Sequence, residues 1–301
     1  MHNHAAVISA AFFYGEKSME AIFSQDTLTI TGEYIDITSV FDCGQFFRYF
    51  KEEETQHIIA GDKLAFVSGD EKSFLLSGIK EKDEAFWKRF LRLDMSYTET
   101  EKEFLQDDVL KRTVPVCHGM RILKQEEFET LISFIISVNN NIKRIKKIIE
   151  ALCARCGKKR EVCGKTYFAF PSPENIASLD ESDLIEIGAG YRAPYILKTS
   201  RAVCDGFDLS MPYNMEYEEA KKYLCSLMGV GPKVADCILL FSYNKFEAFP
   251  VDTWVKKLLY EFYDFKPKSN KEAVDFAFKR FGKNAGIAQQ YLFHYMRTLN
   301  S

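Results

Sequence analysis

The sequence contains no hydrophobic run of the length that a membrane-spanning helix requires, which is about 20 residues. The apolar stretch from Ala5 to Tyr14 covers only about ten residues, and it follows His2 and His4 rather than Lys or Arg. A secretory signal usually begins with basic residues. We therefore expect residues 1–18 to form a disordered leader, with a weak signal peptide as the alternative.

A strong excess of charge of either sign is also missing. The 301 residues carry a formal net charge of −3, so any binding to nucleic acid has to come from a local basic patch. The eight cysteines are scattered along the chain, and several fall within apolar helical patterns. This distribution predicts reduced thiols in a cytoplasmic protein rather than a disulfide framework.

The patterns that are present predict an α+β fold. Residues 27–79 alternate in the manner of strands, with Gly-Asp pairs at 61–62 and 69–70 that are typical of hairpin turns. We expect an antiparallel sheet of four or five strands there, and helices almost without interruption after about residue 120. The predicted organisation is a leader (1–18), a sheet domain with flanking helices (19–120) and a helical body (121–301) with a helix-hairpin-helix at 219–241.

The segment "GVGPKVADCILLF" (Gly229–Phe241) joins two of the predicted helices. Its glycines permit positive φ and close approach of a ligand to the backbone, and Pro232 suits the first position of a helix. The free N–H groups of such a helix start can bind a phosphate. The segment lacks the Gly-Lys-Ser/Thr ending of a Walker A loop. The alternative is a compact helical hairpin with a glycine C-cap.

Two ionisable residues follow at the starts of helices. Lys233 lies in a first helical turn, where the helix dipole disfavours a cation, and a desolvated lysine of this kind can serve as a nucleophile. Asp252, in "AFPVDTWVKKLL", precedes another helix and is expected to act as its N-cap. The functional interpretation is a carboxylate held rigidly beside Lys233. Both interpretations can hold for the same residue.

These motifs together resemble the helix-hairpin-helix, Gly-Pro-Asp superfamily of DNA glycosylases. The lysine in the hairpin and the later aspartate are similar to those of its bifunctional members. The segments "FDCGQFFRY", "FIISVNNNIKRI", "GAGYRAPYI" and "GIAQQYLF" resemble 8-oxoguanine DNA glycosylase in particular. The resemblance runs from about residue 27 to 297 and implies a TATA-binding-protein-like sheet domain before the helical body. No cysteine follows Cys237, which excludes the iron–sulfur cluster of a related branch.

The resemblance implies a base-excision mechanism without a cofactor. The enzyme would flip 8-oxoguanine out of duplex DNA. Lys233 would attack the sugar C1′, expel the base and form a Schiff base, and β-elimination would then nick the strand. Asp252 would stabilise the positive charge that develops on the sugar. The amides of Gly229 and Gly231 would hold a phosphate, with a bridging monovalent or calcium ion.

The resemblance also assigns a base pocket. The carbonyl of Gly44 would accept the N7–H that 8-oxoguanine has and guanine lacks, and an unpaired buried acceptor costs about 1–3 kcal/mol. Phe293 and Cys237 would sandwich the base. Gln289 would contact its Watson–Crick edge. Phe241 and Pro250 belong to the same implied pocket. From the residues alone, Gly44 is equally well a simple turn, and Phe293 and Cys237 are ordinary core.

The triple-Asn segment and an arginine pair are implied to contact the opposite strand. Asn139 would fill the gap left by the flipped base, with Asn140 beside it and Tyr191 as a wedge, while Arg144 and Arg192 would bind the orphaned cytosine. The alternative for the Asn segment is a connector that adopts left-handed backbone and caps a helix. A basic run between Lys143 and Arg160 favours phosphate contact nearby.

The chain departs from the better-studied animal members at two positions. Trp254 stands where those members have a phosphate-contacting histidine, and Met296 replaces the acidic residue that supports it. The pair indicates an apolar contact to DNA in place of a polar one. Near the basic run, "CARC" and Cys163 could suggest a zinc site, but a fourth ligand is missing and the whole chain has only five histidines.

Three hypotheses follow. The first is a bifunctional 8-oxoguanine glycosylase/lyase that prefers the lesion opposite cytosine, and the second is a glycosylase for alkylated purines, which would need neither the Gly44 carbonyl nor Lys233. The third is a non-catalytic DNA-binding module, which would need the hairpin glycines but neither Lys233 nor Asp252. The presence of all these residues favours the first. We expect a monomer that acts on double-stranded DNA in the cytoplasm, associated with the nucleoid in a prokaryote.

Overall fold

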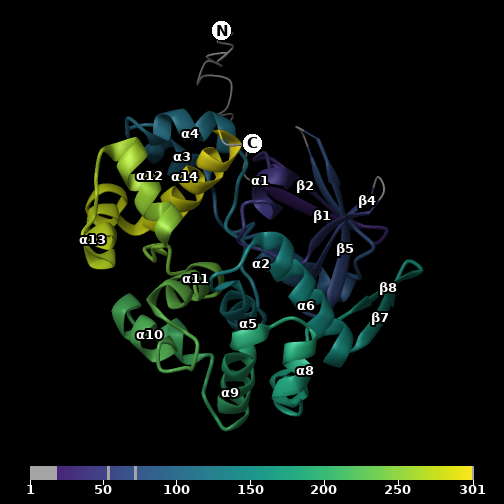
Figure 1. Ribbon diagram of the computed structural model, residues 1–301. Helices are drawn as coiled ribbons and strands as arrows, with labels where there is room; N and C mark the ends of the chain where they lie inside the picture. Colours follow the sequence, from purple (N-terminus) through teal and green to yellow (C-terminus); the bar gives the residue numbers. More distant parts are fainter. Residues whose placement is uncertain (1–18, 53–54, 71–72, 300–301) are drawn as a thin grey trace.

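The computed structural model describes residues 19–52, 55–70 and 73–299, so the predicted leader at 1–18 lies outside the described residues. The N-terminal part forms an antiparallel sheet, and the rest forms a helical body beside it (Figure 1). This arrangement confirms the α+β fold that the sequence predicts. Within these ranges no helix combines the length and the apolar character needed to cross a membrane.

Six strands, not four or five, make up the main sheet, because one strand precedes residue 27. A turn at Gln25-Asp26, with positive φ at both residues, joins the first two strands. It lacks the Asn-Gly or Asp-Gly signature that usually marks such a turn. The sheet order is β1-β2-β6-β5-β4-β3, with bounds β1 Glu20–Ser24, β2 Thr27–Thr31, β3 Tyr49–Glu52, β4 Thr55–Ala60, β5 Lys63–Gly69 and β6 Phe74–Ser77.

The two predicted hairpins are confirmed. Ala60 pairs with Lys63 across the Gly61-Asp62 turn of β4 and β5, where Gly61 has positive φ. Gly69 pairs with Phe74 where β5 leads into β6. The turn chemistry therefore fixes the register that places alternate side chains of these strands in the core.

The sheet buries its apolar side chains against two short helices, α1 (Ile37–Phe41) and α2 (Glu84–Phe90). Leu28, Ile58 and Leu76 from the strands share one cluster with Trp87 and Phe90 of α2. Burying each such side chain contributes about 1.5–3 kcal/mol. This shared core holds α2 against the sheet.

Helix α5 (Glu127–Ser137) lies in the centre of the helical body and is buried along most of its length. Its Glu129 carboxylate accepts a hydrogen bond from the Gly61 amide at 2.7 Å and lies 3.5 Å from the Arg48 guanidinium. Burial raises the pKa of Glu129. The contacts of Glu129 tie the helical body directly to the sheet.

The helices expected after residue 120 are present, but a two-stranded hairpin interrupts them. Strands β7 (Lys159–Val162) and β8 (Lys165–Phe168) pair across a Cys163-Gly164 turn with positive φ at both residues. The expectation of uninterrupted helix is wrong there. The remaining elements are α3 Thr98–Phe104, α4 Leu110–Cys117, α6 Ile142–Cys156, α7 Pro173–Ala177, α8 Glu181–Glu186, α9 Ala193–Cys204, α10 Tyr217–Leu224, α11 Pro232–Ser242, α12 Thr253–Tyr263, α13 Asn270–Phe281 and α14 Ala285–Leu299, with 3₁₀ turns η2 Glu81–Asp83, η3 Gly190–Arg192, η4 Met211–Asn214 and η5 Gly282–Asn284.

Candidate active site and DNA interface

The helix-hairpin-helix consists of α10, a glycine turn and α11. Gly229 has φ +84°, and a Cβ at this position would lie 2.7 Å from Cβ of Tyr195. Gly231 is exposed and forms the N-cap of α11 without a side-chain capping bond, followed by Pro232. Free amides at the start of α11 are therefore available to an anion, as the sequence predicts.

The resemblance also implies an ion at this turn. Backbone carbonyl oxygens are suitable ligands for a hard cation. The carbonyl of Met228 accepts a hydrogen bond from Thr199 Oγ1 at 2.7 Å, and that of Leu227 accepts one from the Val230 amide. Each oxygen keeps a second lone pair, so the residues fit such an ion, and its binding stays a prediction.

Lys233 projects from the first turn of α11 and is half-buried. Its Nζ lies 5.4 Å from the centroid of the Phe134 ring, which itself stacks on Phe241. Cys237 lies one turn further along α11, and burial raises the pKa of its thiol to about 11. Lys233 is therefore the amine of this site, while the neighbouring thiol stays protonated at neutral pH.

Asp252 is the N-cap of α12. Its Oδ1 accepts a hydrogen bond from the Val255 amide at 2.9 Å, which confirms the capping interpretation. The capping bond fixes the orientation of the carboxylate at the wall of a pocket that Lys233 also lines. Asp252 is thus both a structural cap and a charged group facing the pocket.

This pocket has a volume of about 530 Å³ and lies between the two parts of the molecule. Six of the predicted site residues line it, namely Gly44, Asn140, Lys233, Asp252, Trp254 and Phe293. Sequence reasoning did not assign its other lining residues to the pocket; these are Phe47, Phe134, Ser137, Asn141, Ile142, Ile145, Met296 and Arg297. Arg297 adds a cation on the rim, where its Nη1 donates to the Asp42 carbonyl at 2.5 Å.

Gly44 adopts φ +84°, in the region that favours glycine. A Cβ there would lie 3.7 Å from the Phe293 ring, so the backbone conformation rather than space requires the glycine. The next residue, Gln45, is fully buried and holds this segment in place: its side chain donates to the Val40 and Arg121 carbonyls and accepts from the Leu123 amide. In the sequence, the only sign of this structural role of Gln45 is its position beside the apolar pair Phe46-Phe47.

The remaining base-pocket residues are buried behind the pocket surface. Phe241, Pro250 and Cys237 belong to the core in this structure. Gln289 is also buried, and its Oε1 accepts a hydrogen bond from Gln290 Nε2 at 2.8 Å. None of these four lines the pocket, so their contacts with a base stay predictions.

The Asn segment forms the turn between α5 and α6. Asn139 is exposed with φ +46°, and Asn141 caps α6 by accepting from the Arg144 amide at 3.0 Å. Asn140 Nδ2 donates to the Ile136 carbonyl at 3.0 Å. The predicted left-handed turn and helix cap are both confirmed. Asn139 is free to project outward, as a wedge into DNA requires.

Tyr191 and Arg192 reach the same turn from η3. The Tyr191 ring is about half exposed, and its hydroxyl donates to the Val138 carbonyl at 3.2 Å. Arg192 is buried, and its guanidinium donates to the carbonyls of Val138 and Asn139. Arg144 is exposed and donates to the Gly188 carbonyl at 3.3 Å. The predicted residues Asn139, Arg144, Tyr191 and Arg192 therefore lie around one turn. The guanidinium of Arg192 is already hydrogen-bonded to backbone carbonyls of that turn.

Trp254 and Met296, the two departures from the animal members, line the same pocket. Trp254 is 52% exposed, and Lys257 Nζ lies 5.6 Å from its ring centroid. Met296 is buried. All eight cysteines are free, and across the described ranges no three His, Cys, Asp or Glu side chains come together to hold a metal ion.

Family models agree with this arrangement over most of the chain. Residues 27–131 match the model described as 8-oxoguanine DNA glycosylase, N-terminal domain. Residues 132–283 match the HhH-GPD superfamily base excision DNA repair protein. The two matched ranges include strands β2 to β6, the helix-hairpin-helix and both Lys233 and Asp252.

Individual proteins give the same picture. The N-glycosylase/DNA lyase of Saccharomyces cerevisiae is 31% identical over 81% of this chain and 72% of its own. A probable N-glycosylase/DNA lyase of Methanothermobacter thermautotrophicus is 35% identical over 64% of this chain and 69% of its own. The 8-oxoguanine glycosylase/lyase of Clostridium acetobutylicum, solved with double-stranded DNA containing cytosine opposite 8-oxoguanine, is 39% identical with a TM-score of 0.88, and the match covers 94% of this chain and 98% of that one.

Proposed function

Because the chain belongs to the 8-oxoguanine DNA glycosylase family of the HhH-GPD superfamily, we propose that it repairs DNA by excising 8-oxoguanine through a lysine Schiff base. It is a bifunctional DNA glycosylase/AP lyase, the class that its relatives' names give them. One observation carries the mechanism: Lys233 and Asp252, from two different helices, line a single pocket together with Gly44 and Phe293.

The nucleophile in this proposal is Lys233 Nζ. Its nitrogen forms a bond to C1′ of the flipped nucleotide while the bond from C1′ to N9 of the base breaks, and the base leaves with the bonding electrons and takes up a proton. The nitrogen then loses one proton, and the C1′–O4′ bond breaks as O4′ takes up a proton, which gives the protonated Schiff base. Abstraction of a proton from C2′ then expels the 3′ phosphate by β-elimination. The half-buried position over the Phe134 ring holds the Lys233 nitrogen at the wall of the pocket.

Asp252 supplies negative charge where the sugar becomes positive. A fixed charge in a partly closed pocket stabilises a developing charge without reorganisation. The capping bond to the Val255 amide holds the carboxylate in place for this purpose. Asp252 therefore needs no movement between binding and bond cleavage.

We further propose that Gly44 selects the oxidised base and that the Asn turn selects the opposite base. The Gly44 carbonyl would accept the N7–H of 8-oxoguanine beside Phe293. Arg144 and Arg192 would contact an orphaned cytosine, which requires Arg192 to release the carbonyls of Val138 and Asn139. The enzyme would act as a monomer on double-stranded DNA in the cytoplasm, associated with the nucleoid in a prokaryote.

Borohydride trapping tests this proposal. Duplexes carrying one 8-oxoguanine opposite each of the four bases are incubated with the enzyme and borohydride, and covalent adducts are separated by electrophoresis. We expect an adduct with the lesion, in highest yield opposite cytosine, and none with Lys233→Gln. Lys222→Gln, a change of an exposed lysine on α10, is the matched control and should retain the adduct.

Different failures have different meanings. Strand binding without an adduct would refute the lyase mechanism. An adduct that survives in Lys233→Gln would assign the nucleophile elsewhere. Equal yields opposite all four bases would refute only the cytosine preference.

A further inference from the structure

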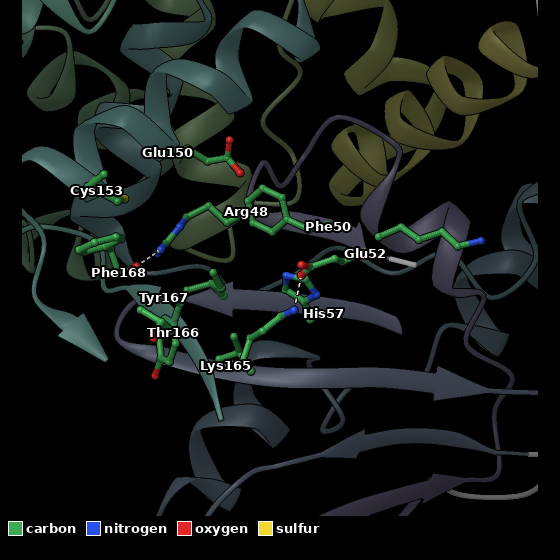
Figure 2. A pocket seen from close by; sticks show the side chains of 14 residues that line it. Arg48, Phe50, Glu52, His57, Glu150, Cys153, Lys165, Thr166, Tyr167 and Phe168 are labelled. Carbon is green, nitrogen blue, oxygen red and sulfur yellow. Dashed lines mark hydrogen bonds and ion pairs between the residues drawn. The ribbon is translucent and has the colours of Figure 1, made fainter. Parts of the chain in front are cut away.

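A second pocket lies between β3, β4, α6 and β8, apart from the candidate active site (Figure 2). Its volume is about 440 Å³, and it shares no lining residue with the pocket of Lys233 and Asp252. The two pockets use successive parts of α6, since Ile142 and Ile145 line the first and Glu150 and Cys153 the second. The proposed glycosylase mechanism makes no use of the second pocket.

Polar contacts of two basic side chains, Arg48 and Lys165, hold the sides of this pocket together. Arg48 is buried, and its guanidinium donates to the Phe168 carbonyl of β8 and to the Gly61 carbonyl. Lys165 and Glu52 form an ion pair at 2.6 Å that links β8 to β3. The hairpin β7–β8 is therefore fastened to the sheet through side chains, with the pocket between them.

One wall of the pocket is an aromatic surface. Phe50 and His57 are cross-strand partners whose rings stack at 5.5 Å with an interplanar angle of 28°. His57 is only 7% exposed, and its Nδ1 makes no hydrogen bond. Burial lowers the pKa of His57, so the imidazole is neutral at neutral pH. An uncharged stack of this kind favours a flat aromatic ligand.

An exposed carboxylate, Glu150, lies at the rim of this pocket. Glu150 extends from α6 on the side of Phe50 and, within the described chain, makes no hydrogen bond or ion pair (Figure 2). Burial raises the pKa of Glu150, and the charges of Lys146 and Arg48 oppose that rise. The direct contacts of these two cations nevertheless go to other groups, since Arg48 pairs with Glu129 and Lys146 donates to the Tyr49 carbonyl at 2.8 Å. The Glu150 oxygens can therefore accept hydrogen bonds from a ligand.

The two features together select one class of heterocycle. A carboxylate binds best to two adjacent N–H donors, which it engages with both oxygens. Among the natural bases only guanine presents two neighbouring donors, N1–H and the N2 amino group, on one edge. Adenine and cytosine have a ring nitrogen acceptor beside their amino group. The lone pair of that nitrogen would repel the carboxylate. Thymine flanks its single donor with carbonyl oxygens.

We propose that this pocket is a second nucleobase site that binds a guanine-type base, stacked on the Phe50 ring, which His57 supports from behind, with its donor edge on Glu150. The site is separate from the candidate active pocket, and its occupancy does not depend on glycosylase chemistry. A base held there would lie along α6 from the Asn turn, on the same helix that begins at the proposed DNA contact.

The test is a titration of the full-length chain with guanosine, followed by the ring C–H resonances of labelled histidine, with His57 assigned through His57→Phe. We expect the His57 resonance to move with guanosine, to move less with inosine, which lacks the amino group, and to stay still with adenosine. Glu150→Gln should weaken guanosine binding about tenfold or more, because a charged acceptor is lost. Phe50→Leu should weaken it by a similar factor through loss of stacking.

Glu20→Gln, a change of an exposed glutamate on β1, is the matched control and should leave guanosine binding unchanged. An unmoved His57 resonance with millimolar guanosine would overturn the proposal, and so would equal responses to guanosine and adenosine. Binding that is unaffected by both Glu150→Gln and Phe50→Leu would place the ligand elsewhere. Because no outcome depends on base excision, failure here leaves the proposed glycosylase function intact.

Discussion

At the scale of single residues, Asp252 combines two roles that one substitution can separate. Asparagine caps a helix as well as aspartate does, so Asp252→Asn should keep the bond to the Val255 amide and change the free energy of unfolding by less than about 1 kcal/mol. The substitution removes the charge that stabilises the transition state. We expect single-turnover excision of 8-oxoguanine to slow by about 10²–10³-fold.

The control for this prediction is a cap far from the pocket. Ser269 caps α13 by accepting from the Glu272 amide at 3.1 Å, so Ser269→Ala should lower stability by about 1 kcal/mol without slowing excision. If Asp252→Asn excised at the native rate, the carboxylate would be a cap only.

Some side-chain roles could be read from the sequence and others could not. Asp252 as a cap and Asn139 as a left-handed residue follow from local chemistry, because each depends on a few neighbouring atoms. Gln289 and Arg192 could not be placed in this way. Their hydrogen bonds go to Gln290 and to the carbonyl of Val138, and only the packed structure decides whether those bonds or a ligand satisfy a buried polar group.

At the scale of elements, the hairpin turn depends on two glycines for different reasons. Gly229→Ala introduces a side chain at φ +84° and a contact of 2.7 Å with Tyr195, so we expect a loss of more than about 2 kcal/mol in the free energy of unfolding. Gly231 has ordinary φ and open space, so Gly231→Ala should cost less than about 1 kcal/mol. Urea unfolding of the two variants measures the difference. Equal losses would contradict the assigned geometry.

A buried ion pair joins the two helices of the hairpin. Asp236 on α11 accepts from Lys221 at 2.9 Å and from the Tyr217 hydroxyl at 2.7 Å. Burial raises the pKa of Asp236 to about 6. A carboxyl whose pKa is raised by folding opposes folding while it is ionised, so its cost is fully present above pH 6 and is relieved as the pH falls toward 4.

This sign leads to a measurable pH dependence. Between pH 7.5 and pH 5, protonation of Asp236 should add about 1 kcal/mol to the free energy of unfolding. The double variant Lys221→Met/Asp236→Asn removes the titrating group and its partner together, so it should lack this increment. Urea unfolding at the two pH values gives the comparison. An identical pH dependence in both proteins would show that Asp236 does not titrate in this range.

The elements that the sequence did not predict have a common cause. The turn at Gln25-Asp26 and the turn at Cys163-Gly164 both adopt positive φ, but neither carries the usual hairpin dipeptide. Strands β1 and β7 are also short and partly exposed, and β7 has Val162 as its one apolar residue. Long amphipathic helices such as α6 and α14 were predictable because their period is repeated over several turns.

At the scale of the whole molecule, the sequence predicted the order of the elements and the residues of one site, but it did not predict the cavities that form between distant elements. The α+β order follows from the change in hydrophobic period, and the pairing of Lys233 with Asp252 was expected. The second pocket was not, because it is formed by β3, α6 and β8, which are far apart in the chain. A cavity between such elements leaves no pattern in any one of them.

The net charge of −3 makes DNA binding a local property of one face. Lys143 and Lys147 are exposed on α6, immediately after the Asn turn, and should neutralise phosphates there. Each phosphate contact contributes about 0.9 to the slope of log affinity against log salt concentration. The double variant Lys143→Gln/Lys147→Gln should therefore lower the magnitude of that slope by about 1.8. Lys268→Gln, an exposed lysine before α13, should leave it unchanged, and a slope that responds equally to both changes would mean that DNA is bound by diffuse charge rather than by this face.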